Sequence, residues 1–175
     1  MVRQKRFLFI AALILTLLIA PACAASKKMS VAESVAARQK FTDYAKKFLG
    51  CTYASGGIGP KSFDCSGFVF SMSRESIGLQ LPRSSPAIYS FTDKIDDAEL
   101  ELGDLVFFQT TSSGKISHVG IYLGNKEFIH SASDGPETGI IISTLEKGYW
   151  KRHYVGAGRI LPKTNTKNQK VTSSK

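Results

Sequence analysis

The chain has 175 residues and a formal net charge of +9, with 43% hydrophobic residues, 21% charged residues and three cysteines. Three basic residues near the start and four lysines in the last thirteen residues carry most of this charge; without them it falls from +9 to +2. A nearly balanced body argues against nucleic-acid binding, and so few cysteines argue against a disulfide-stabilised scaffold.

The first 25 residues have the pattern of an export signal. Basic residues precede a mostly apolar run of 14 residues, Phe7 to Ala20, whereas a membrane-spanning helix needs about 20. Small residues around Cys23 allow two kinds of processing. An ordinary signal peptidase would cut after "ACA" and release a soluble protein, whereas the relaxed lipobox "IAPAC" would make Cys23 a lipidated first residue. A retained N-terminal anchor is the alternative to both.

Residues 30–162 are predicted to form one domain that begins with a helix. Within "SVAESVAARQKFTDYAKKFLG", Ser30 and Glu33 form a capping box and Gly50 supplies the stop. Four apolar side chains recur at helical spacing and are expected to face the core: Val31, Val35, Tyr44 and Phe48.

Two shorter helices are predicted after the glycine-rich loop "CTYASGGIGPKSF". The first starts at about Cys65, with Asp64 as its N-cap and Gly78 after its last turn. The second lies in "RSSPAIYSF", with Ser85 as its cap and Pro86 at its first position.

Short β-rich runs separated by turn residues follow Leu102. They are "DLVFFQT", "SHVGIYLG", "EFIHSAS", "GIIIST" and "HYVGAGRIL". Helices followed by a strand meander predict an α+β domain in which the N-terminal helices pack on an antiparallel sheet of five to six strands. Residues 163–175, rich in Lys, Ser, Thr and Asn, are predicted to be a disordered basic tail.

Cys65 is the first candidate for chemistry. At the first turn of a helix it meets unpaired backbone N–H groups and the positive end of the helix dipole, which favour thiolate over thiol. A thiolate nucleophile also needs a base and a group that orients the base. Two other roles stay open from the sequence: a disulfide with Cys51 and a small buried residue. We expect Cys65 to be labelled by thiol reagents and Cys51 to be largely protected.

Two of the three histidines supply such partners. His118 and His130 lie in adjacent strand-like runs joined by "LGNKE". A connecting loop of three or five residues would place them on the same face of a hairpin, opposite or diagonal to each other, whereas an even-length loop would separate them. Cross-strand neighbours lie close enough for one imidazole to orient the other. His153, beside Lys151 and Arg152, is interpreted as a surface residue.

A metal site is the competing interpretation of these residues, because Cys65, His118 and His130 are all zinc-ligand types. The sequence lacks the short Cys-x-x-Cys or His-x-x-x-His spacing typical of zinc sites. We therefore expect no metal and no other cofactor.

Several motifs together resemble the NlpC family of papain-like cell-wall cysteine peptidases, in particular its branch of murein endopeptidase lipoproteins. They are "FDCSGFV", "LPRSS", "LELGDLVFF", "SHVGIYLGNKEFIHSAS" and "YWKRHYVGAGRIL", and they cover nearly the whole body in the family's order. The resemblance implies a papain-like fold with the catalytic cysteine at a helix N-terminus.

The resemblance also implies a role for each matching residue. Cys65 would be the nucleophile, His118 the general base and acid, and His130 the residue that orients His118. Tyr53 would contribute its hydroxyl to the oxyanion hole. Further contacts with the substrate are implied for four residues: Asp64, Ser66, Arg83 and Ser84.

The function implied is hydrolysis of amide bonds in peptidoglycan stem peptides or their cross-links, by a monomer of the cell envelope that touches a membrane only through a lipid on Cys23. Thr52, Ser55 and the "PAIY" after "RSS" depart from the family pattern near the substrate groove, so they bear on specificity. A cysteine-dependent amidase that separates sugar from peptide, and a non-catalytic envelope binding protein, are the alternatives.

Overall fold

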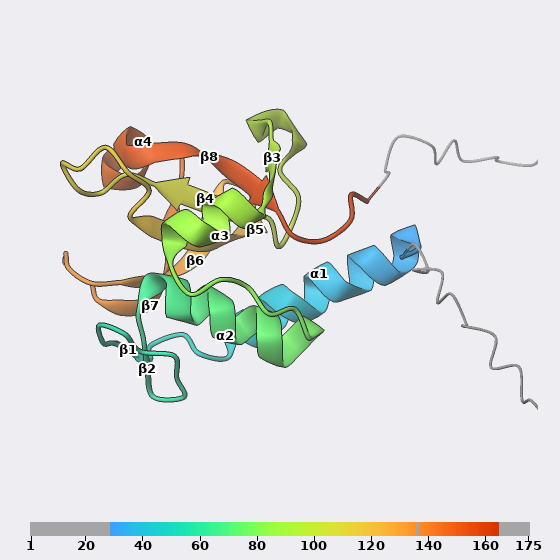
Figure 1. The fold of residues 1–175 in the computed structure, drawn as a ribbon, viewed down its shortest axis with the longest axis horizontal. Coiled ribbons are helices and arrows are strands. Elements are labelled where there is room, and N and C mark those ends of the chain that lie inside the picture. The colour runs from blue at the N-terminus through green and yellow to red at the C-terminus, as the bar shows by residue number, and fades with distance from the viewer. Residues whose placement is uncertain (1–28, 136, 165–175) are drawn as a thin grey trace, which may run out of the picture.

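The computed structural model describes residues 29–135 and 137–164. The predicted export signal with Cys23, and all but the first two residues of the predicted tail, lie outside the described residues. Within them the domain contains four α-helices and two sheets (Figure 1). The helices are α1 (Val31–Lys46), α2 (Cys65–Ile77), α3 (Ser85–Phe91) and α4 (Gly148–His153), with a short 3-10 turn at Asp97–Glu99.

Six strands form an antiparallel sheet in the order β3-β8-β4-β5-β6-β7, which confirms the predicted α+β class. The strands are β3 (Asp93–Ile95), β4 (Leu105–Phe108), β5 (His118–Gly124), β6 (Glu127–Ala132), β7 (Gly139–Thr144) and β8 (Tyr154–Arg159). Each of the five predicted strand runs contains one of them. A separate parallel pair, β1 (Thr52–Tyr53) and β2 (Ser62–Phe63), lies in the loop before α2.

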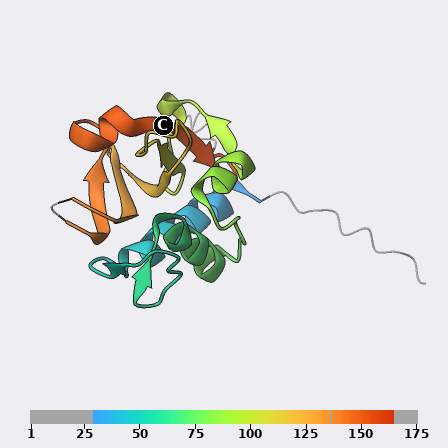
Figure 2. The same cartoon turned by 60° about the vertical axis from the view of Figure 1, so that its left-hand side comes forward.

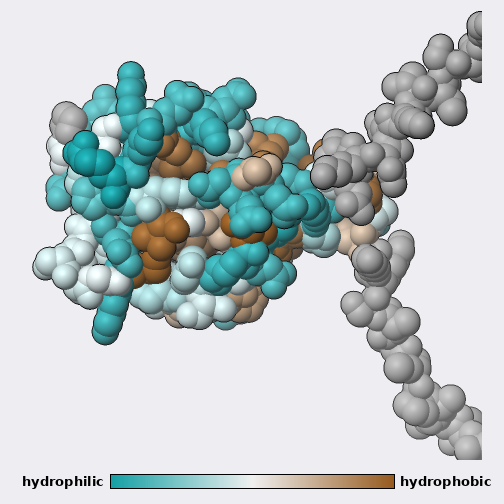
Figure 3. Space-filling model, turned by 90° about the horizontal axis from the view of Figure 1, so that it is seen from above, coloured by the Kyte–Doolittle hydropathy of each residue, from teal (hydrophilic) through white to brown (hydrophobic). Residues whose placement is uncertain are grey.

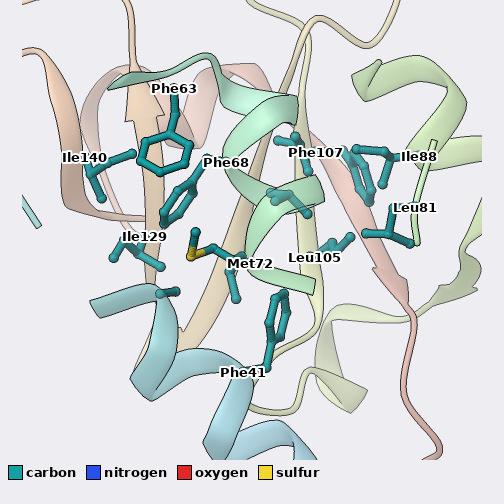
Figure 4. Close-up of a cluster of buried hydrophobic side chains, with 14 residues drawn as sticks. Phe41, Phe63, Phe68, Met72, Leu81, Ile88, Leu105, Phe107, Ile129 and Ile140 are labelled. Atoms are coloured by element: carbon teal, nitrogen blue, oxygen red, sulfur yellow. The ribbon is translucent and has the colours of Figure 1, made fainter. Parts of the chain in front are cut away.

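Helices cover the two faces of the large sheet unequally. The helices α1, α2 and α3 pack on one face, and Figure 2 shows α1 and α2 stacked below the strands. Their core joins phenylalanine and aliphatic side chains, with Met72 of α2 near its centre and Phe41 of α1 beneath it (Figure 4). The opposite face carries a smaller aromatic cluster against Trp150 of α4. The sheet therefore separates two hydrophobic cores, one on each of its faces.

The buried face of α1 differs from the predicted one in its first turns, whereas Tyr44 and, just beyond the helix, Phe48 pack on the core as predicted. The capping box of Ser30 and Glu33 is present, but Val31 and Val35 are 47% and 51% exposed. The helix instead buries Arg38, whose guanidinium binds the Asp104 carboxylate at 2.9 Å. A buried charge is tolerated when it is paired and hydrogen-bonded, as here. This pairing joins α1 to the start of β4.

The two following helices match their predicted positions, with one correction. Helix α2 begins at Cys65, the Asp64 side chain accepts a hydrogen bond from the Gly67 N–H at 2.6 Å, and Gly78 ends the helix in the left-handed conformation. Helix α3 begins one residue earlier than predicted. Ser84, not Ser85, is its N-cap, and the Ser84 side chain makes no capping hydrogen bond.

In the view of Figure 3, the visible surface of the described part is mostly hydrophilic, with separate hydrophobic patches. No helix among the described residues has the length and apolar character required to cross a bilayer.

Candidate active site

Cys65 is the first residue of α2, at the edge of the core between the helices and the sheet. Its side chain is partly exposed, and its thiol donates a long hydrogen bond of 3.9 Å to the Ser117 carbonyl, directly before β5. Cys51 and Cys65 are both free, so the disulfide alternative is wrong for this structure. The helix thus presents a free thiol to the strand that carries His118.

Close backbone packing fixes the start of α2. The Asp64 N–H donates to the Gly57 carbonyl at 3.0 Å, and a Cβ added at Gly67 would lie 2.0 Å from that same oxygen. A glycine is therefore required at position 67 for the helix to approach the loop. From the sheet, the Ser131 hydroxyl donates to the Phe63 carbonyl at 2.8 Å, which ties β6 to the residues before Cys65.

The β5–β6 hairpin brings the two histidines together. Nε2 of His118 and Nδ1 of His130 are 2.9 Å apart. The turn has only two residues, Asn125 and Lys126, both with positive φ, which is shorter than the predicted three or five. A register shift between Tyr122 and Gly124 adds a residue to β5. The bulge offsets the even-length turn, so both rings still lie on the same face.

Both rings are buried, and burial governs their protonation. His118 is 6% exposed and His130 is fully buried. Desolvation disfavours the charged imidazolium and lowers the pKa of His118 to about 3. Burial, with a further contribution from the neighbouring His118, holds the pKa of His130 well below its usual value. The resting pair is therefore neutral near pH 7.

Trp150 covers the histidine pair, a position that the sequence did not predict. Its ring centroid lies 4.7 Å from that of His118 and 4.5 Å from that of His130. Phe128 stacks on His130 with ring centroids 4.7 Å apart and also contacts Trp150 edge-to-face. The quoted motif "YWKRHYVG" contained Trp150, but its position over the histidines depends on α4, which we did not predict.

Burial also raises the pKa of the Cys65 thiol, and the Asp64 carboxylate raises it further. Backbone N–H groups of Ser66 and Val119 oppose this shift without reversing it. The thiolate expected from the helix N-terminus is thus not the resting form. Among the described residues, the thiol makes no hydrogen bond to the His118 ring, although such contacts are often long before substrate binds.

Tyr53 of β1 lies beside the cysteine. Its pKa is raised, first by burial and then by repulsion from negative charge on Cys65, Asp64 and Asp134. A raised pKa keeps the phenol protonated near neutral pH. Tyr53 therefore offers an O–H donor within electrostatic range of Cys65.

Asp64, Ser66 and Arg83 form a polar cluster on the helix side of Cys65. The Arg83 guanidinium binds both Asp64 oxygens, at 2.9 and 2.7 Å, and the Ser66 hydroxyl at 3.1 Å. Burial alone would raise the pKa of Asp64, but hydrogen bonds from Arg83 and Gly67 hold it below its usual value. Ser84 is exposed at the start of α3 and makes no side-chain hydrogen bond to this cluster.

A hollow of about 450 Å³ is lined in part by Trp150 and Ser143, which both contact His130. Trp150 thus covers the histidine pair and also lines this hollow. The acidic residues in the lining are Asp134 and Glu137. Its remaining lining residues are small, aliphatic or aromatic: Ala132, Gly135, Ile141, Ile142, Ser143 and Tyr149. The described residues contain no cluster of three His, Cys, Asp or Glu side chains able to hold a metal ion.

A thiol at a helix N-terminus, beside a buried pair of histidines on a sheet, is the arrangement that cysteine nucleophilic catalysis requires. The sequence profile of the NlpC/P60 family matches residues 50–159, and the chain belongs to this family.

Two relatives from Escherichia coli K12 carry names of murein enzymes. The chain is 43% identical over 120 residues to the murein DD-endopeptidase MepH, covering 66% of this chain and 44% of MepH. It is 36% identical over 135 residues to MepS, named murein DD-endopeptidase and murein LD-carboxypeptidase, covering 77% of this chain and 69% of MepS. The chain thus spans less than half of MepH and about two thirds of MepS.

A solved structure supports the papain-like fold. A crystal structure from Staphylococcus aureus, described as similar to a lipoprotein of the NLP/P60 family, is 35% identical with a TM-score of 0.63. It covers 73% of this chain, which in turn covers 42% of the crystallised chain.

Proposed function

We propose that the protein is a peptidoglycan endopeptidase that hydrolyses amide bonds of murein stem peptides or their cross-links. The observation that carries this proposal is the free Cys65 thiol at the start of α2, beside the strand on which His118 contacts His130 at 2.9 Å. Membership in the NlpC/P60 family, and relatives named as murein endopeptidases, supply the substrate class.

Catalysis begins from a neutral thiol and a neutral imidazole. The Cys65 thiol turns from the Ser117 carbonyl toward Nδ1 of His118, the ring nitrogen that His130 leaves free. His118 takes the thiol proton as sulfur attacks the amide carbonyl, and the carbonyl π electrons move to its oxygen. His118 then gives its proton to the leaving nitrogen as the C–N bond breaks. Water hydrolyses the thioester by the same route and restores the thiol.

The oxyanion of each tetrahedral intermediate needs donors that are already in place. The Cys65 backbone N–H at the α2 N-terminus is one, and the Tyr53 hydroxyl is the other. The helix dipole adds favourable potential at this point. Because thiol and imidazole both start neutral, the attack creates two charges together: a positive one on His118 and a negative one on the oxygen that these donors face.

We assign two parts of the substrate to two different regions of the site. The Arg83–Asp64–Ser66 cluster lies on the helix side and offers charged and hydroxyl groups to a peptide stem. The hollow lined by Trp150, whose ring contacts both histidines, is where we place the other part of the substrate. Ser84 is left without a supported role.

We place the enzyme in the cell envelope, where murein is found. An export signal in residues 1–25 would deliver it there, and lipidation of Cys23 would anchor it to a membrane. A monomeric state completes the proposal, since one chain supplies the cysteine, both histidines and the two proposed oxyanion donors.

Incubating purified murein sacculi with the full chain and analysing the soluble fragments by mass spectrometry tests the function and identifies the bond. We expect the wild-type protein to release peptide-linked fragments and Cys65→Ala to release none. Cys51→Ala is the matched control, because it removes the other described cysteine and should leave the fragments unchanged. Glycan chains freed of peptide would show an amidase instead, and identical profiles for wild type and Cys65→Ala would refute catalysis by this residue.

A further inference from the structure

Ser143 of β7 extends the histidine pair by one more hydrogen bond. Its Oγ lies 2.9 Å from Nε2 of His130, whose Nδ1 is 2.9 Å from Nε2 of His118. The contact follows from the sheet register, in which His130 faces Ile141 and Ser143 is two residues further along β7 on the same face. The three side chains therefore form a continuous chain across three adjacent strands.

The direction of this chain decides whether His118 can act as a base. A neutral imidazole carries one N–H and one lone pair. If Nε2–H of His130 donates to Ser143, Nδ1 of His130 accepts from Nε2–H of His118, and Nδ1 of His118 keeps the lone pair that a thiol proton requires. If the order is reversed, His118 carries its proton at Nδ1 and cannot accept another there while neutral.

We propose that Ser143 is a positioning residue that accepts a hydrogen bond from Nε2–H of His130 and thereby holds both histidines in the tautomer that leaves Nδ1 of His118 free for Cys65. This assignment rests on the proposed function of Cys65 and His118. Ser143 touches neither the thiol nor the substrate in this scheme, and it acts through the two rings.

The surroundings of Ser143 support the accepting role. Among the described residues, the His130 ring is the hydrogen-bond partner of the Ser143 hydroxyl, and Ser143 itself lines the hollow of about 450 Å³. The hydroxyl proton can therefore turn toward water in the hollow while the oxygen lone pairs face His130. The His130 ring cannot turn in the same way, because Phe128 and Trp150 pack against it.

The tautomers can be measured without substrate by long-range ¹H–¹⁵N correlation spectra of the ¹⁵N-labelled full chain at pH 7.5. The chain has only three histidines, so a His153→Gln variant assigns the remaining signals to the pair. We expect His118 and His130 both to carry their proton at Nε2. In Ser143→Ala, the Nδ1–H form of His130 should gain population and kcat on murein fragments should fall about tenfold, with KM changed less than twofold.

Ser143→Thr keeps the hydroxyl and should restore both the tautomer and kcat. Thr144→Ala is the control on the same strand, because the Thr144 hydroxyl bonds the Glu146 N–H and not a histidine. Urea unfolding of each variant identifies any loss of fold. An Nδ1–H tautomer in the wild-type His130, or an unchanged tautomer and kcat in Ser143→Ala, would overturn the proposal. The predicted tautomers in a protein that releases no murein fragments would instead refute the proposed function alone.

Discussion

The face of the large sheet that packs on α2 is built of aliphatic and phenylalanine side chains, whereas the face under α4 carries aromatic rings and both histidines. The same strands serve both faces, because neighbouring residues alternate across the sheet. On β5, for example, Val119 and Ile121 join the α2 core, while His118 points to Trp150. The first core thus holds the helix that carries Cys65, and the second holds the histidines that we propose to act on its proton.

This division predicts that substitutions on the two faces fail in different ways. A change on the α2 face should lower the free energy of unfolding and reduce activity only as the folded fraction falls. A change at the histidines should reduce activity in a protein that remains folded.

The largest effect is expected for His118→Gln. Removing the general base should lower kcat/KM for murein peptides about a thousandfold, since positioned acid–base groups contribute about 10² to 10⁴. The glutamine keeps a polar side chain beside His130, so the urea midpoint at pH 7.5 should change little. His153→Gln is the matched control, because His153 lies outside the pair and bonds the Tyr149 carbonyl. Equal losses in the two variants would contradict the assignment of His118.

The opposite behaviour is expected for Phe68→Ala on the other face. Phe68 is fully buried in α2 and packs edge-to-face against Phe63, with ring centroids 5.5 Å apart. Truncating a buried phenylalanine costs about 3 to 5 kcal/mol of unfolding free energy. Urea unfolding should show this loss, and activity per folded molecule should stay close to the wild-type value. A large fall in kcat without a change in the free energy of unfolding would contradict the claim that the α2 face serves stability and the histidine face serves activity.

The sequence predicted the first face better than the second. Local signals fixed α2: Asp64 before it, Gly78 after it and an apolar run between them. The positions of five of the six strands of the large sheet were likewise predicted from their β-rich composition. Helix α4 was not predicted, because "GYWKRH" has only six residues and no apolar periodicity. Its position, and with it Trp150, depends on packing against the sheet.

Long-range polar contacts explain the other differences. The buried side of the first turns of α1 could not be inferred from hydrophobic spacing, because it depends on Arg38 meeting Asp104, 66 positions away. Whether His118 and His130 lie on the same face of the β5–β6 hairpin depended on a β-bulge, and no local sequence motif predicted this bulge. Ser143 was missed for the same reason, since its partner His130 lies on another strand.

The smallest expected effect is a pH dependence of stability that belongs to the histidine face. In the unfolded chain a histidine has a pKa of about 6.5, whereas burial in the folded protein lowers the pKa of His118 to about 3 and that of His130 well below 6.5. Below about pH 6.5 the unfolded state therefore binds protons that the folded state excludes. Stability is fully present above this pH and is lost as the pH falls, by up to about 1.4 kcal/mol per pH unit for each histidine.

Urea unfolding between pH 7.5 and 5 should therefore show a steeper loss for the wild-type protein than for His118→Gln/His130→Gln. This window lies above the usual pKa values of carboxylates, so the lowered pKa of Asp64 adds little to the difference. The double variant has no buried imidazole to keep neutral, and its midpoint should stay nearly constant. If both proteins lost stability equally over this range, the histidines would not be buried in their neutral form, and catalysis would have to start from a charged pair.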